Sequence, residues 1–159
     1  MITRALIAAL VLAFPAQAQN KPGLSEVPPG VDPNAHSIQD RKDVVSWKLL
    51  AQVELVKQKD RYLPQFSSSV AALDQKEVKL QGFIVPLGMG DKQTHFILSA
   101  MPVTCPFCVP VGAESLVEVK SKNPVRFTFE AVVLRGRLSV LKEDPIGVFY
   151  LLTDAVESN

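Results

Sequence analysis

The chain of 159 residues has few cysteines and lacks the motifs of several common enzyme classes. Its two cysteines are too few for a domain that disulfides hold together. It contains no Gly-rich phosphate loop, no HExxH and no G-x-S-x-G sequence, which argues against nucleotide hydrolysis, zinc proteolysis and serine hydrolysis. We therefore predict no catalytic residues and favour a protein that is not an enzyme.

An excess of charge of either sign is also missing. The chain has 17 Lys and Arg against 16 Asp and Glu, and without Arg4, which lies in a segment expected to be removed, the two signs balance. A nucleic-acid-binding protein carries a basic surface, so we exclude nucleic acid as a partner. The hydrophobic content of 47% is sufficient for one folded domain.

Residues 1–18 have the pattern of a secretory signal peptide. Arg4 precedes an apolar run at 5–14, and Ala16 and Ala18 supply the small residues of a cleavage site. The run is about ten residues long, whereas a membrane-spanning helix needs about 20. We expect cleavage after Ala18, a mature chain in the periplasm or secreted, and no insertion of that mature chain into a membrane.

The rest of the chain divides into a leader and one domain. Residues 19–37 contain four prolines and two glycines, which predicts an extended, flexible leader. Residues 38–159 form the single domain that we expect. At its start the pattern predicts a helical turn over 43–50, a strand over 52–57 and a short helix over 67–73 that a serine caps.

The sequence beyond residue 75 predicts β-strands. The hydrophobic pattern assigns five of them to residues 78–86, 94–99, 116–120, 125–140 and 147–153. The alternation changes phase near Val132 and Val133, which indicates a bulge in one long strand, with Gly136 relieving the bend. A bent strand can pair on two sides of a closed sheet. We therefore expect a mainly β fold, a small five-stranded antiparallel OB-like barrel with a short N-terminal helical segment.

Thr104-Cys105-Pro106-Phe107-Cys108 is the motif with the clearest chemistry. It lies between the second and third predicted barrel strands, and its two sulfur atoms can point at one metal ion or at each other. Thiolates prefer soft ions such as zinc and copper(I), and a bound metal protects thiols from oxidation outside the cytoplasm. We predict that Cys105 and Cys108 bind zinc or copper(I) for carriage or delivery to a transporter or client protein.

Two other interpretations of the cysteine pair remain open. The pair could exchange thiols with disulfides, although Pro110 and Gly112 exclude a long helix starting at Cys105 and the strand–helix alternation of a thioredoxin fold is missing. Alternatively, a structural disulfide would close a small ring and stabilise the chain little. In that case the barrel would be a binding module for a protein or a small ligand.

The two histidines, His36 and His95, are the remaining candidate metal ligands. A closed zinc site needs four ligands, and two cysteines with two histidines match that number. His95 starts a predicted strand, and an extended chain from His95 to Ala100 covers roughly 17 Å, so it reaches the cysteines only if their loop folds back. Otherwise His95 is a residue of the sheet. His36 ends the leader and could approach from there.

Three segments carry a resemblance to a known family. Residues 78–87 (VKLQGFIVPL), residues 94–99 (THFILS) and Cys105-Pro106-Phe107-Cys108 resemble domain-of-unknown-function family 3299 (DUF 3299), a family of exported bacterial proteins. The resemblance runs from about Trp47 to the C-terminus. It implies a small periplasmic or lipid-anchored protein with an accessory role beside transporter components. Many members have Cys-x-His followed by prolines at the loop, so the second cysteine here exchanges one soft-metal ligand for another.

Overall fold

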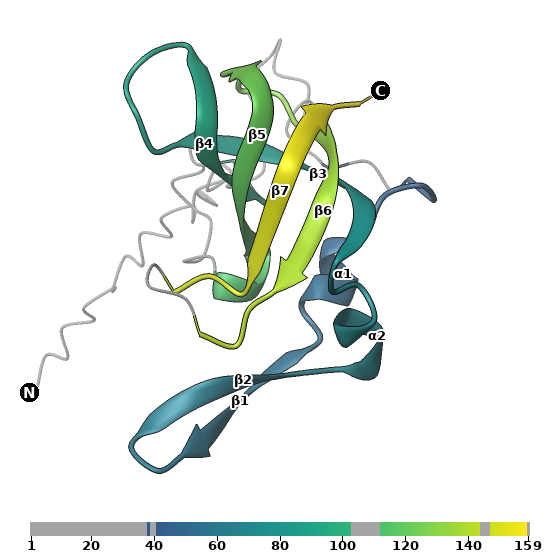
Figure 1. The fold of residues 1–159 in the computed structure, drawn as a ribbon, viewed down its shortest axis with the longest axis vertical. Helices are drawn as coiled ribbons and strands as arrows, with labels where there is room; N and C mark the ends of the chain where they lie inside the picture. The colour runs from purple at the N-terminus through teal and green to yellow at the C-terminus, as the bar shows by residue number, and fades with distance from the viewer. Residues whose placement is uncertain (1–37, 39–40, 103–111, 144–146, 159) are drawn as a thin grey trace, which may run out of the picture. The chain divides into compact units, whose positions relative to one another are not determined.

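The computed structural model describes residues 38, 41–102, 112–143 and 147–158 (Figure 1). The expected signal segment and leader, residues 1–37, lie outside this part of the chain. The described residues form seven strands, two short α-helices and one 3-10 turn. None of these helices combines the length and the apolar character that crossing a membrane requires.

Five strands close a barrel in the order β3–β4–β5–β7–β6, and β6 pairs back onto β3 (Figure 1). Their bounds are β3 Lys76–Pro86, β4 Lys92–Ser99, β5 Leu116–Arg126, β6 Val132–Val140 and β7 Tyr150–Glu157. The prediction of a mainly β, five-stranded OB-like barrel is confirmed. The prediction that it is antiparallel throughout is wrong, because β5 and β7 pair in parallel. β7 lies between β5 and β6, which run in opposite directions, so it must run parallel to one of them.

β3 changes its pairing partner along its length. Its first part, residues 76–82, pairs with β6, and its second part, residues 83–86, pairs with β4. Gly82 stands where the partner changes. A Cβ atom there would lie 2.7 Å from the Ser99 carbonyl oxygen and 2.8 Å from Leu98 Cγ, so only glycine allows β3 and β4 to approach this closely.

The single bulged strand predicted over 125–140 is two strands. β5 ends at Arg126, the Phe127 N–H donates to the Asp91 carbonyl oxygen at 2.8 Å, and β6 begins at Val132. The phase change in the sequence therefore marks a connection and not a bulge. The irregularity of β6 falls between Arg135 and Arg137, where β6 faces β7. β5 also continues beyond its predicted end at residue 120.

The two short helices form where the sequence predicts them. α1 spans Trp47–Leu50 and α2 spans Ser68–Ala71. At each start a serine hydroxyl, of Ser46 or Ser67, accepts a hydrogen bond from a backbone N–H in the first turn at 3.2 Å. The Trp47 indole N–H donates to the Gln81 carbonyl oxygen at 2.7 Å, which attaches α1 to β3.

A separate hairpin precedes the barrel. Its strands are β1 Val53–Gln58 and β2 Arg61–Phe66, which form a two-stranded antiparallel sheet. β1 was predicted from the sequence and β2 was not. The Phe66 ring packs against Phe149 and Tyr150, with its centroid 6.0 Å from each, so the base of the hairpin rests on the strand end that closes the barrel.

The core fills the barrel and extends under the helices. Its fully buried side chains are large and aliphatic, with two aromatic rings among them. They are Tyr150, Phe96, Leu50, Leu80, Ile84, Leu98, Leu134, Leu138, Leu152, Val70, Val117 and Val119. Leu50 of α1 and Val70 of α2 belong to the same cluster as residues of β3 to β7, so the barrel and the helical segment share one core.

Tyr150 joins this core to α1. Its hydroxyl donates to the Leu50 carbonyl oxygen at the end of α1, and burial, followed by the negative charge of Glu114, raises the pKa of Tyr150 well above its ordinary value. We expect Tyr150→Phe to lower the free energy of unfolding by about 1–3 kcal/mol, because the buried carbonyl oxygen loses its donor. Urea unfolding monitored by circular dichroism measures this.

The matched control for Tyr150→Phe is Tyr62→Phe. Tyr62 lies on the hairpin with an exposed side chain, so loss of its hydroxyl should change the free energy of unfolding by less than about 0.5 kcal/mol. Equal effects of the two substitutions would contradict the structural role of the Tyr150 hydroxyl.

The segment before α1 is held on β3 by Asp43. Its carboxylate accepts hydrogen bonds from Arg41 at 3.0 and 3.1 Å and from Lys79 at 3.0 Å. These bonds, the one from Arg41 first, hold the pKa of Asp43 well below its usual range. A depressed carboxyl pKa stabilises the folded state above the unfolded pKa, about 4, and this contribution is lost as the pH falls below it.

We therefore expect the Tm of the unsubstituted protein to fall more steeply on acidification than the Tm of the Asp43→Asn variant. The Tm difference between the two proteins should be largest near neutral pH and shrink toward pH 2. Asp154→Asn is the control, since the Asp154 carboxylate makes no ion pair within the described residues. Parallel Tm curves for the chain and Asp43→Asn would contradict the prediction.

Candidate functional site

The cysteine segment lies just outside the described residues. Cys105 and Cys108 fall within 103–111, and His36 falls within 1–37, so their arrangement stays a prediction. Both flanks of the cysteine segment are described. Its N-terminal flank follows β4, and its C-terminal flank is the 3-10 turn η1, Ala113–Ser115, which leads into β5. The places where the two ends of the cysteine segment join the barrel are therefore known.

Hydrogen bonds fix the two flanks to one another. The Ala100 N–H donates to the Ser115 carbonyl oxygen at 3.0 Å, one step beyond the pairing of Ser99 with Leu116 in the β4–β5 ladder. The Ser115 N–H in turn donates to the Gly112 carbonyl oxygen at 2.9 Å. On the other flank, the Met101 N–H donates to the buried Ser99 hydroxyl at 3.2 Å. Both ends of the cysteine segment thus start from adjacent strands of the barrel.

A small hollow of about 240 Å³ lies beside Ala100, the base of the cysteine segment. The segment before β1 supplies most of its lining, together with Gln81 of β3. The Gln81 side-chain oxygen is buried and has no hydrogen-bond partner among the described residues. Its lining residues are Ile38, Arg41, Val44, Val45, Ser46, Trp47, Lys48, Gln81 and Ala100. The hollow beside the base of the segment is therefore lined partly by apolar side chains.

His95 lies in β4 and has a partner in the sheet. Its Nε2 atom is 2.7 Å from Glu118 Oε1, and Lys120 Nζ lies 3.4 Å from the same oxygen. The Glu118 side chain is only 8% exposed, whereas that of His95 is 51% exposed. Two groups that can carry positive charge thus meet one nearly buried carboxylate. This geometry gives the imidazole a structural role in the sheet and fixes one of its two nitrogen atoms.

Among the described residues, no group of three or more His, Cys, Asp or Glu side chains is placed to hold a metal ion. Any metal site must therefore draw on residues outside this part of the chain or on ligands from elsewhere. The predicted ligands Cys105 and Cys108 lie outside it.

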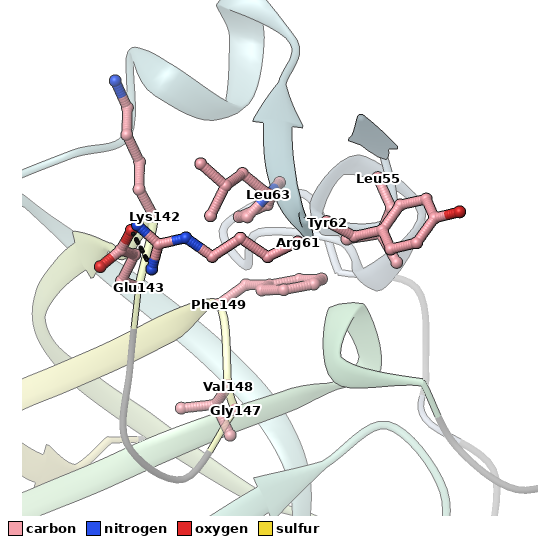
Figure 2. Close-up of a pocket in the computed structure, with 10 residues that line it drawn as sticks. Leu55, Arg61, Tyr62, Leu63, Lys142, Glu143, Gly147, Val148 and Phe149 are labelled. Carbon is pink, nitrogen blue, oxygen red and sulfur yellow. Dashed lines mark ion pairs between the residues drawn. The ribbon is translucent and has the colours of Figure 1, made fainter. Parts of the chain in front are cut away.

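A larger hollow, of about 510 Å³, lies between the hairpin and the connection from β6 to β7. Figure 2 shows Arg61 reaching from β2 to Glu143, where the guanidinium lies 3.1 Å from a carboxylate oxygen. The apolar lining comes from both sides, including Leu55 and Tyr62 of the hairpin and Phe149. Sequence reasoning missed this hollow because it did not predict β2. The sequence feature that could have indicated the hollow is a pair of apolar residues, Leu55 and Tyr62, that stand next to charged residues.

Comparison with known proteins places the chain in a family. The search of curated proteins found no match. Among solved structures, a DUF3299 family protein from Pseudomonas aeruginosa PAO1 is similar, with a TM-score of 0.47 and 22% sequence identity over 60% of this chain and 68% of that chain. A family model described as protein of unknown function (DUF3299) matches residues 16–149. Because that match covers most of the sequence, the chain belongs to the DUF3299 family.

Proposed function

We propose that this protein is a periplasmic accessory protein that binds a soft metal ion through Cys105 and Cys108 and passes it to a transporter or client protein. The ion is zinc or copper(I). The observation that carries the proposal is the fixed base of the cysteine segment, where the Ala100 N–H bonds to the Ser115 carbonyl oxygen at 3.0 Å on a closed barrel.

A fixed base favours ligand binding by a short segment. The two flanks leave adjacent, paired strands, and β4 and β5 belong to a barrel with a single packed core. Fewer chain conformations are then lost when two sulfur atoms close on one ion. The barrel thus acts as the support and the cysteine segment as the part that binds.

The number of ligands suits delivery better than permanent storage. A closed structural zinc site needs four protein ligands, and two thiolates leave positions that a partner protein can fill. Copper(I) can be held by the two thiolates alone. Both thiols release their protons on binding, so the affinity falls as the medium becomes acidic. The ion then moves to the partner as incoming ligands replace the sulfur atoms one at a time.

The expected compartment supports the same reading. The signal-like residues 1–18 direct the chain out of the cytoplasm, where free thiols are readily oxidised. A bound metal ion keeps a cysteine pair available under those conditions. His95 is engaged with Glu118 at 2.7 Å, so the two sulfur atoms remain the principal ligands. His36, at the end of the leader, is a candidate additional ligand.

Metal analysis of the reduced protein tests the proposal. Protein purified under reducing conditions and titrated anaerobically with zinc or copper(I) should bind about one ion per chain. Absence of binding would overturn the proposal, and the reduction potential would then identify the alternative. A potential between about −270 and −120 mV is that of a thiol–disulfide exchanger, whereas one below about −300 mV marks a structural disulfide.

A further inference from the structure

Within the part of the chain that the structure describes, the outer edges of the β1–β2 hairpin pair with no other strand. Its turn consists of two residues, 59–60, and Gln58 lies opposite Arg61. In a hairpin with a two-residue turn, the residues flanking the turn form a hydrogen-bonded pair, and bonded and non-bonded pairs alternate from there. The bond from the Ser67 N–H to the Gln52 carbonyl oxygen, at 3.0 Å, continues this alternation beyond the base of the hairpin.

The alternation determines which backbone groups point outward. In β1, Leu55 and Lys57 lie in the non-bonded pairs, so their N–H and C=O groups point away from β2. In β2, Pro64 lies opposite Leu55 and occupies the corresponding outward position. Proline has no N–H group, so β2 lacks a donor in the middle of its outer edge.

The two edges of the hairpin therefore differ. Proline on an edge strand prevents another strand from pairing with it, and β2 is protected in this way. β1 contains no proline, and outside the hairpin no backbone hydrogen bond joins Leu55 or Lys57 to another described residue. An edge of this kind is a template for an added strand.

The side chains beside the open edge indicate what it binds. Leu55 is 60% exposed, and Tyr62, on the same face, is 64% exposed. Lys57 is the single charged residue on that face, and none of the ion pairs between described residues includes it. The side chains of the face are Val53, Leu55, Lys57, Tyr62, Pro64 and Phe66. The face thus combines an apolar area with a positive charge that forms no ion pair with a described residue.

We infer that the outer edge of β1 binds an extended segment of another protein that carries an apolar and an acidic residue two positions apart. The segment adds a strand to the hairpin. Its backbone pairs with the outward groups of Leu55 and Lys57, an apolar side chain covers Leu55, and a carboxylate faces the Lys57 ammonium group. This inference does not depend on the metal site, because none of its residues belongs to the cysteine segment.

A peptide-binding experiment with an edge-blocking variant tests the inference. The probe is a fluorescent peptide that repeats Val-Thr-Glu-Thr, so that valine and glutamate follow one another along one face of the added strand, and its binding to the chain is followed by anisotropy. Leu55→Pro removes an outward N–H group and leaves the bonds between β1 and β2 in place, as Pro64 does on the other strand. We expect Leu55→Pro to weaken binding at least about fivefold, because one backbone hydrogen bond is lost. Leu55→Thr, which keeps the N–H group, should bind more tightly than Leu55→Pro.

A charge reversal tests the preference for acidic segments separately. Lys57→Glu leaves the backbone edge intact and should shift the preference from the glutamate peptide to a matched peptide that repeats Val-Thr-Lys-Thr. This variant keeps the inference testable if Leu55→Pro disturbs the hairpin, which circular dichroism would reveal. If neither substitution changes the binding of the peptide, the inference is wrong.

Two other occupants of the edge would also overturn the inference. If the chain self-associates in sedimentation and Leu55→Pro abolishes that association, the edge pairs with a second copy. If the peptide binds only to a chain that lacks residues 19–37, the leader occupies the edge. Binding of the glutamate peptide to the monomeric full chain, weakened by Leu55→Pro, supports the inference.

Discussion

Replacing Cys105 or Cys108 by serine is expected to lower the affinity for zinc or copper(I) by at least about 100-fold. Loss of a residue that merely supports a metal ligand typically costs about 10- to 100-fold. Loss of a thiolate itself removes a charged, soft ligand from a site to which the chain brings two cysteines. Anaerobic competition titration against a chromogenic chelator measures the change.

Met89→Leu is the matched control for the cysteine variants. It removes a sulfur atom from a fully exposed position in the turn between β3 and β4 and should leave the affinity unchanged. His95→Gln tests the remaining nitrogen ligand of the described residues. An affinity that survives both cysteine substitutions, or one that His95→Gln lowers as strongly as they do, would remove the basis for a two-thiolate site.

Gly82→Ala is expected to lower the free energy of unfolding by about 2–3 kcal/mol, the upper part of the range for overpacked cores. A Cβ atom at this position would lie 2.7 Å from the Ser99 carbonyl oxygen and 3.1 Å from the Trp47 ring. The carbonyl belongs to β4, which is paired on both sides, so the backbone cannot retreat without opening the barrel. Denaturant unfolding at unchanged m-value measures the loss.

Gly88→Ala is the control for Gly82→Ala. A Cβ atom there would lie 3.3 Å from the end of the Gln93 side chain, which has to shift by only a few tenths of an ångström to accommodate it. Reduced freedom of the unfolded chain offsets part of any strain, so the free energy of unfolding should change by less than about 1 kcal/mol. If Gly82→Ala were as mild as Gly88→Ala, the tight approach of β3 and β4 would not be essential to the barrel.

The barrel was predictable because most of its strands have a clear hydrophobic pattern. Residues 78–86 and 94–99 match β3 and β4 to within a few residues. The end of β5 was not predictable, since Ser121 to Pro124 have the composition of a turn. In the structure this stretch stays within β5 beside a register shift at Gln93 and His95, where β4 does not pair regularly with it. Proline is tolerated at such an irregularity.

The hairpin was only half predictable for a different reason. β2 contains Pro64 and lacks alternation, and its turn has Lys59 and Asp60 where hairpins favour Asn-Gly. Its position depends on Phe66 packing against rings that follow more than eighty residues later, at 6.0 Å. Such contacts stabilise a short two-stranded sheet that would be marginal alone, and no local pattern reveals them.

The candidate site shows the same division between local and distant information. The cysteine motif is local and was found from spacing alone, but its metal remains a prediction. The partner of His95 comes from another strand, 23 positions away in the sequence, so the ion pair with Glu118 could not be inferred from the residues around His95. The fixed base of the cysteine segment likewise depends on the β4–β5 pairing.

The insertion of β7 between β5 and β6 has a consequence for the order of folding. Because β5 and β6 are joined in the sheet only through β7, the barrel cannot close and its core cannot be completed before Tyr150–Glu157 has been made. Pairings between distant segments also form slowly. The edges of β5 and β6 that β7 covers therefore stay exposed until that strand has been made and has paired with both.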